Sequence, residues 1–162
     1  MEVLLNELYR EIAITVDKII PENWGKFFFY AQVSNDGGGT YFFYSPVNDP
    51  EIYEYSLKIP QKFQINEKEF EENEMKLFNL AEKVREIFKE NDQELWYSFT
   101  LSLDNSGKLN LNFDYTDWHK TNYGFSDQLK IWKYKYLKMM PVDERGQQLI
   151  SRYLAEYPNN PI

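Results

Sequence analysis

The side chains in this sequence that are best suited to chemistry gather around residue 114. Asp114 and Asp117 lie three positions apart, and Trp118 and the only histidine, His119, follow directly. Two neighbouring carboxylates can bind a hard cation such as Ca²⁺ or Mg²⁺, or act as an acid and base pair on a sugar. The segment DYTDW lacks the DxDxDG pattern of an EF-hand loop. A solvated loop at a hairpin end is therefore the simpler interpretation, and a metal site, small-ligand site or enzyme using the Asp114–Asp117 loop is the alternative.

Other catalytic patterns find no support. The sequence has one histidine and no cysteine, which rules out thiolate chemistry and the usual nitrogen and sulfur ligands of zinc. No GxSxG segment marks a serine nucleophile. Glycines 37–39 stand in a row but lack the spacing of a phosphate-binding loop. We therefore expect a protein that is not an enzyme and that uses no cofactor or metal, with His119 on the surface.

The charge balance narrows the choice of partners. The 162 residues carry a net charge of −8, and 18% of them are aromatic. A chain this acidic is repelled by nucleic acid phosphates and anionic membranes, whereas a basic protein is attracted to it. The acidic amphipathic start does not resemble a signal peptide, and no apolar run is long enough to span a membrane. We expect a cytoplasmic protein that binds neither nucleic acid nor membranes.

Residues 95–118 organise the predicted fold. Apolar positions alternate with small or polar ones on both sides of the turn Asp104–Gly107, a pattern typical of a β-hairpin with one apolar and one solvated face. Trp96 and Trp118 bracket this hairpin and are expected to anchor packing. Asp114 and Asp117 are expected at its solvated end.

A second, aromatic hairpin is predicted from residues 24–34 and 40–45, joined by a turn at 35–39. Aromatic residues occupy both odd and even positions of its strands, so rings point to both faces of the sheet. This favours central strands that are covered on both faces, and an exposed aromatic patch on one face is the alternative. Residues 52–59 are expected to add another strand. The predicted sheet is antiparallel and has about five strands.

Helices are predicted on either side of these strands. Apolar steps of three and four indicate a helix over 2–20, beginning its stripe at Leu4, and another over 66–90 with Asn66 as its N-cap. Residues 143–156 fit a last helix, whereas 127–140 fit a helix or an irregular element. The sequence thus predicts an α+β fold in which the N-terminal, central and C-terminal helices pack on the sheet. We expect a single domain over 1–157 and a loose tail over 158–162.

The order of these features resembles a known family. NELY with IIPENW near the start, and ELWYSFTLSLDNSGKLNLNFDY in the organising hairpin, are similar to the YezG-like family of bacterial antitoxin and immunity proteins. The resemblance covers residues 6–153 and contains no catalytic signature. It implies a cytoplasmic immunity protein that binds and neutralises a cognate toxin domain, often a nuclease, of LXG-type polymorphic toxins exported by the type VII pathway. A regulatory or structural subunit with another protein partner is a further alternative.

Candidate partner-binding residues follow from charge and ring content. Residues 67–94 contain ten acidic and five basic side chains, so this helix is either simply solvated or meets a basic partner. Nuclease domains are basic because they bind phosphates, and an acidic surface complements them. Protein interfaces also need aromatic anchors. The candidates are Glu71, Glu72, Glu74, Asp114, Asp117, Trp118 and Tyr123.

Overall fold

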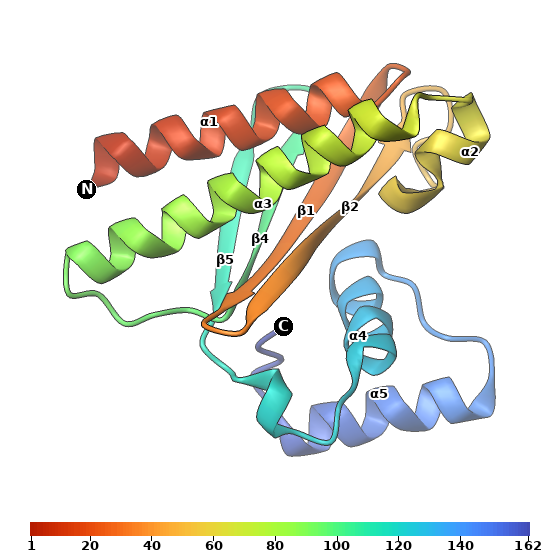
Figure 1. Ribbon diagram of the computed structural model, residues 1–162. Coiled ribbons are helices and arrows are strands. Elements are labelled where there is room, and N and C mark those ends of the chain that lie inside the picture. The colour runs from red at the N-terminus through yellow and green to blue at the C-terminus, as the bar shows by residue number, and fades with distance from the viewer. The chain divides into compact units, whose positions relative to one another are not determined.

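The computed structural model describes residues 1–162 and has an α+β fold (Figure 1). The chain divides into two compact units, Met1–Phe113 and Asp114–Ile162. The first contains a five-stranded antiparallel sheet and its covering helices, and the second is mainly helical. The predicted fold class is confirmed, whereas a single domain over 1–157 stays a prediction.

The sheet has the strand order β3-β2-β1-β4-β5. Its strands are β1 (Trp24–Ser34), β2 (Gly37–Pro46), β3 (Glu54–Tyr55), β4 (Ser98–Asp104) and β5 (Leu109–Asp114). Strand β1 is central, because it pairs with β2 on one side and β4 on the other. Both predicted hairpins are therefore confirmed, and they join through their first strands.

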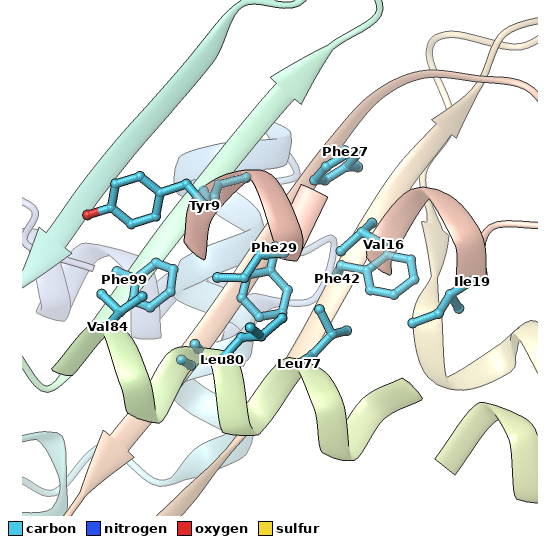
Figure 2. Packing of buried hydrophobic residues seen from close by; sticks show 14 of the residues in the cluster. Tyr9, Val16, Ile19, Phe27, Phe29, Phe42, Leu77, Leu80, Val84 and Phe99 are labelled. Atoms are coloured by element: carbon cyan, nitrogen blue, oxygen red, sulfur yellow. The ribbon is translucent and has the colours of Figure 1, made fainter. Parts of the chain in front are cut away.

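Helices α1 (Glu2–Ile19) and α3 (Glu67–Glu90) run side by side across one face of this sheet (Figure 1). Their apolar stripes interlock with rings from the strands in one core, which includes Val16, Leu80, Phe29 and Phe99 (Figure 2). The Asn66 side chain accepts a hydrogen bond from the Glu69 N–H at 3.1 Å, as the capping pattern predicts. These contacts confirm the predicted helices 2–20 and 66–90 to within one residue at their ends.

Leu4 is an exception to the predicted stripe of α1. Its side chain is 53% exposed, whereas the adjacent Leu5 and Tyr9, one turn after Leu5, are buried. The stripe that faces the core therefore begins at Leu5, and the inclusion of Leu4 is wrong.

The turn of the aromatic hairpin is shorter than predicted. Ser34 pairs with Gly37, so the connection is only Asn35–Asp36 and the glycines belong to β2. At Gly38, φ is +157° and a Cβ atom would lie 1.8 Å from the Gln32 carbonyl oxygen. Glycine is needed there because the two strands approach too closely for any side chain.

The second face of the sheet is also buried. Phe28, Tyr30, Tyr41 and Phe43 are each at most 7% exposed, which confirms that the aromatic strands are covered on both faces. The small residues of β4 on this face, Ser98, Thr100 and Ser102, are buried too. The expected solvated face of the 95–118 hairpin is therefore wrong for β4. Its small side chains sit beside large ones on β1, with Thr100 opposite Tyr30 and Ser102 opposite Phe28.

Residues 52–59 form a strand over only two positions. After β3 the chain turns into a 3₁₀ helix (Ser56–Lys58) and the short helix α2 (Ile59–Phe63). The Ser56 hydroxyl accepts a hydrogen bond from the Phe42 N–H at 3.0 Å. This side chain takes the place of a strand carbonyl, so the predicted longer strand is wrong.

The unit Asp114–Ile162 contains a 3₁₀ turn (Trp118–Lys120) and the helices α4 (Phe125–Leu137) and α5 (Glu144–Glu156). Of the two alternatives for residues 127–140, the helix is confirmed. The Asp143 side chain caps α5 by accepting from the Gly146 N–H at 3.2 Å.

The last residues differ from the loose tail that was expected. The Ile162 N–H donates to the Tyr153 hydroxyl at 3.1 Å, and Lys135 donates to the Asn160 carbonyl at 2.6 Å. The Ile162 side chain is 4% exposed. The chain end is thus bonded into its own unit.

Candidate partner-binding surfaces

Asp114 is part of a buried hydrogen-bond network. One carboxylate oxygen accepts from the Trp118 indole N–H at 2.6 Å, and the other accepts from the Thr116 N–H at 2.9 Å. The side chain is 3% exposed, so the expected solvated hairpin end is wrong for Asp114. Burial raises the pKa of the Asp114 carboxyl, and the hydrogen bonds from Trp118 and Thr116 oppose that rise.

Trp118 and Tyr123 belong to an aromatic cluster inside the same unit. The ring of Trp118 packs against those of Tyr123, Tyr153 and Tyr157, with centroid distances of 4.9 to 6.0 Å. Trp118 is 1% exposed and Tyr123 is 3% exposed. The expected anchoring role of Trp118 in packing is confirmed, as is that of Trp96, which is fully buried in the sheet unit.

The remaining polar groups of the 114–123 segment are used locally. The Asp117 side chain caps the start of the 3₁₀ turn by accepting a hydrogen bond from the His119 N–H at 3.2 Å. It also lies 3.8 Å from the Lys120 amine. His119 is exposed, as expected. The structure holds no group of three or more histidine or acidic side chains arranged to bind a metal ion. The carboxylates of this segment therefore organise the loop itself.

The acidic candidates on α3 lie in the other unit, near the start of the helix. Glu71 and Glu72 are exposed, whereas Glu74 is partly buried. Burial raises the pKa of Glu74, and the neighbouring charge of Glu71 raises it further. Glu74 in turn contributes to a raised pKa of Tyr55, after the larger effect of burial. No ion pair involves Glu71, Glu72 or Glu74, so this end of α3 keeps a net negative charge.

The negative charge of the protein is concentrated in one unit. Met1–Phe113 has 20 acidic and 11 basic side chains, a net charge of −9, whereas Asp114–Ile162 has 6 acidic and 7 basic ones, a net of +1. Of the seven candidate residues, the structure brings Asp114, Asp117, Trp118 and Tyr123 together in one unit and Glu71, Glu72 and Glu74 together in the other. Their contact with a partner stays a prediction.

A groove that the sequence prediction missed lies between α1 and α3. Leu4, Leu8 and Ile87 supply its apolar floor, and its rim is formed by charged side chains of both helices. We call it the α1–α3 groove; its volume is about 270 Å³. The rim residues are Glu7, Glu11, Lys83, Glu86 and Glu90. Its signal in the sequence is a pair of glutamates four residues apart beside the apolar stripe of each helix.

No helix in the structure combines the length and apolar character needed to cross a membrane. The architecture is a sheet unit with an acidic helical cover and a helical unit built on an aromatic cluster. The sequence itself matches a known family: the family described as "Immunity protein YezG-like" matches residues 5–151. The chain belongs to this family.

Individual relatives cover most of the chain. The immunity protein YezG of Bacillus subtilis is 31% identical over 152 residues, which span 93% of this chain and 99% of the relative. The type VII secretion system protein EsaG of Staphylococcus aureus is 31% identical over 140 residues, spanning 86% of this chain and 85% of EsaG. YezG of Bacillus spizizenii is 27% identical over 150 residues. The family resemblance drawn from the sequence motifs is therefore confirmed.

Proposed function

We propose that this chain is an immunity protein that binds and neutralises a cognate toxin domain without catalysing a reaction itself. The observation that carries the proposal is the match of residues 5–151 to the YezG-like immunity family. Two relatives that align with more than nine tenths of the chain are themselves named immunity proteins. An inhibitor acts by binding, which fits a structure in which the Asp114 carboxylate is bonded to Trp118 and the Trp118 ring packs on Tyr123.

The toxin in this proposal is a basic nuclease domain of an LXG-type polymorphic toxin, exported by the type VII pathway. The printed name of EsaG assigns that relative to type VII secretion. The net charge of −9 on the sheet unit supports a basic partner, because opposite surface charges speed association and favour correct pairing. A nuclease fits this requirement because it must bind phosphates.

The proposal places the chain in the cytoplasm. A nuclease is toxic to its producer where it meets the nucleic acid, and an inhibitor protects only if it occupies the same compartment. Glu71, Glu72 and Glu74 are proposed as an attracting surface, and Asp117 as a contact at the loop. Asp114, Trp118 and Tyr123 are proposed to act from beneath that loop, since they are buried.

A growth test addresses the proposal directly. Bacteria carry an inducible toxin domain, the one encoded beside this gene, with or without this chain on a second plasmid. We expect induction to stop growth in cells without the chain and to leave growth normal in cells with it. YezG of Bacillus subtilis in place of this chain serves as the non-cognate control. Equal loss of growth with and without the chain would refute the immunity role and favour a regulatory or structural subunit.

A further inference from the structure

The α1–α3 groove has an apolar floor that the core of the protein does not use fully. Leu4 and Leu8 are four residues apart and so lie on one side of α1, and Ile87 faces them from α3. Leu8 and Ile87 are partly buried against the core, whereas Leu4 is 53% exposed. Leu4 and the space beside it therefore offer apolar surface on which another apolar side chain can be buried.

The rim of the groove is strongly acidic. Glu7 and Glu11 stand on α1, Glu86 and Glu90 stand on α3, and Lys83 is the only cation among the lining residues, so the rim has a net charge of −3. In each helix the two glutamates are four residues apart, a spacing at which like charges repel.

No ion pair joins a rim glutamate to a cation of the protein, and Lys83 offsets only part of the negative charge. The ion pairs of Lys62 with Glu54 and of Lys120 with Asp117 both lie elsewhere. Cations brought to the rim would remove a repulsion that exists in the chain alone. An apolar floor between unpaired carboxylates is complementary to a segment with apolar residues on one side and lysine or arginine beside them.

We infer that the α1–α3 groove is the docking site for a basic amphipathic segment of the toxin domain. This inference rests on the proposed function, which supplies the partner, and adds where that partner binds. An apolar side chain of the segment covers Leu4 between Leu8 and Ile87, and cations of the segment pair with the glutamates of the rim. Burial of an apolar anchor at the centre of a polar rim is the arrangement that concentrates binding energy in protein interfaces.

The apolar floor is tested with the substitution Leu4→Gln, and Ile14→Gln is its matched control. Ile14 is 55% exposed on the same helix but does not line the groove. Both changes leave the charge unaltered and place a good helix former on an exposed position. The probe is the purified toxin domain encoded beside this gene, with binding measured by surface plasmon resonance on the full chain. We expect Leu4→Gln to weaken binding at least about tenfold, mainly through faster dissociation, and Ile14→Gln to change it less than about twofold.

The acidic rim is tested with two variants that remove the same number of charges. One replaces the four rim glutamates by glutamine. The other replaces four exposed glutamates of the sheet unit that neither line the groove nor belong to the candidate partner-binding residues. The control positions are Glu51, Glu69, Glu82 and Glu94. Both variants lose the same long-range attraction, so an additional loss of affinity of about tenfold or more in the rim variant reports local contact.

The outcomes separate this inference from the proposed function. If the unaltered chain binds the toxin domain and the Leu4→Gln and rim variants bind no more weakly than their controls, the docking site is refuted and the immunity role stands. If the unaltered chain binds no toxin domain, the proposed function fails and its docking site with it. Selective loss in both groove variants, with unchanged thermal unfolding, supports the inference.

Discussion

Asp114 is the residue whose surroundings differ most from what its position in the sequence suggests. The alternating pattern of residues 109–114 assigns an aspartate to the polar face of a strand, yet the side chain is buried and bonded to Trp118. The partner donor lies four residues later, beyond the end of β5. No periodicity connects these two residues, so the burial of Asp114 was not predictable from the pattern alone.

Removing the Asp114 carboxylate should destabilise the protein. In Asp114→Ala the buried Trp118 indole N–H and the Thr116 N–H lose their acceptor. An unsatisfied buried donor costs about 1–3 kcal/mol, so we expect a loss of that order in the free energy of unfolding. Urea unfolding at neutral pH measures it, with Asp114→Asn, which keeps one oxygen acceptor, as an intermediate case. Unchanged stability in Asp114→Ala would show that the network contributes nothing.

The raised pKa of Asp114 also predicts how the stability of the protein changes with pH. Because the folded state raises the pKa of Asp114 above its ordinary value, the folded protein binds the proton more readily than the unfolded chain. The cost of the buried charge is fully present above the folded pKa and disappears as the pH falls towards the ordinary carboxyl value of about 4.

Relative to Asp114→Asn, the unaltered protein should therefore gain stability on acidification. Unfolding free energies of both proteins at about pH 7 and about pH 4.5, taken from urea titrations, give this difference. Other carboxyl groups titrate in both proteins and cancel. If the unfolding free energy of the unaltered protein falls relative to that of Asp114→Asn on acidification, the raised pKa of Asp114 is contradicted.

Among the elements, those with regular periodicity were predictable and those set by single side chains were not. The stripes of α1 and α3 and the alternation in β4 follow from the spacing of apolar residues. The strand expected at residues 52–59 failed because the Ser56 hydroxyl replaces a ladder acceptor. The sequence favours a turn at glycines 37–39, whereas they lie in β2, because no sequence pattern shows how closely β1 and β2 approach at Gly38.

The close approach of β1 and β2 at Gly38 can be tested by a substitution in the aromatic hairpin. In Gly38→Ala the new Cβ atom would lie 1.8 Å from the Gln32 carbonyl oxygen, at a backbone φ of +157°. The strands must move apart or the backbone must be strained, which costs about 1–3 kcal/mol. Gly39→Ala is the control, because nothing lies within 4 Å of its added atom. Thermal unfolding should therefore show a lower midpoint for Gly38→Ala, and equal midpoints would refute the close approach.

The exposed glutamates near the start of α3 are expected to speed association with the toxin domain. Replacing Glu71 and Glu72 by lysine reverses charge at two exposed positions that do not line the α1–α3 groove. We expect slower association with a basic toxin domain, by about tenfold at low salt, an unchanged dissociation rate and an intact fold. The effect should shrink as salt is added. If stopped-flow rates at low salt are unchanged, this end of α3 does not attract the partner.

The whole molecule combines a strongly acidic sheet unit with a nearly neutral helical unit. Composition alone gives the net charge of −8 but not its division into −9 and +1, which depends on where the chain folds into separate units. The family was recognisable from the motifs because they extend along the chain, and the α1–α3 groove was not, because it forms only when two distant helices lie side by side.

The central claim, that this chain neutralises a toxin by binding it, is tested most directly by titration. Purified toxin domain at a fixed concentration is mixed with increasing amounts of this chain, and cleavage of DNA and RNA substrates is measured at each ratio. We expect activity to fall in proportion to the added chain and to vanish at a fixed stoichiometric ratio, as for a tight inhibitor that binds without turnover. Full toxin activity at a large excess of the chain would contradict the claim.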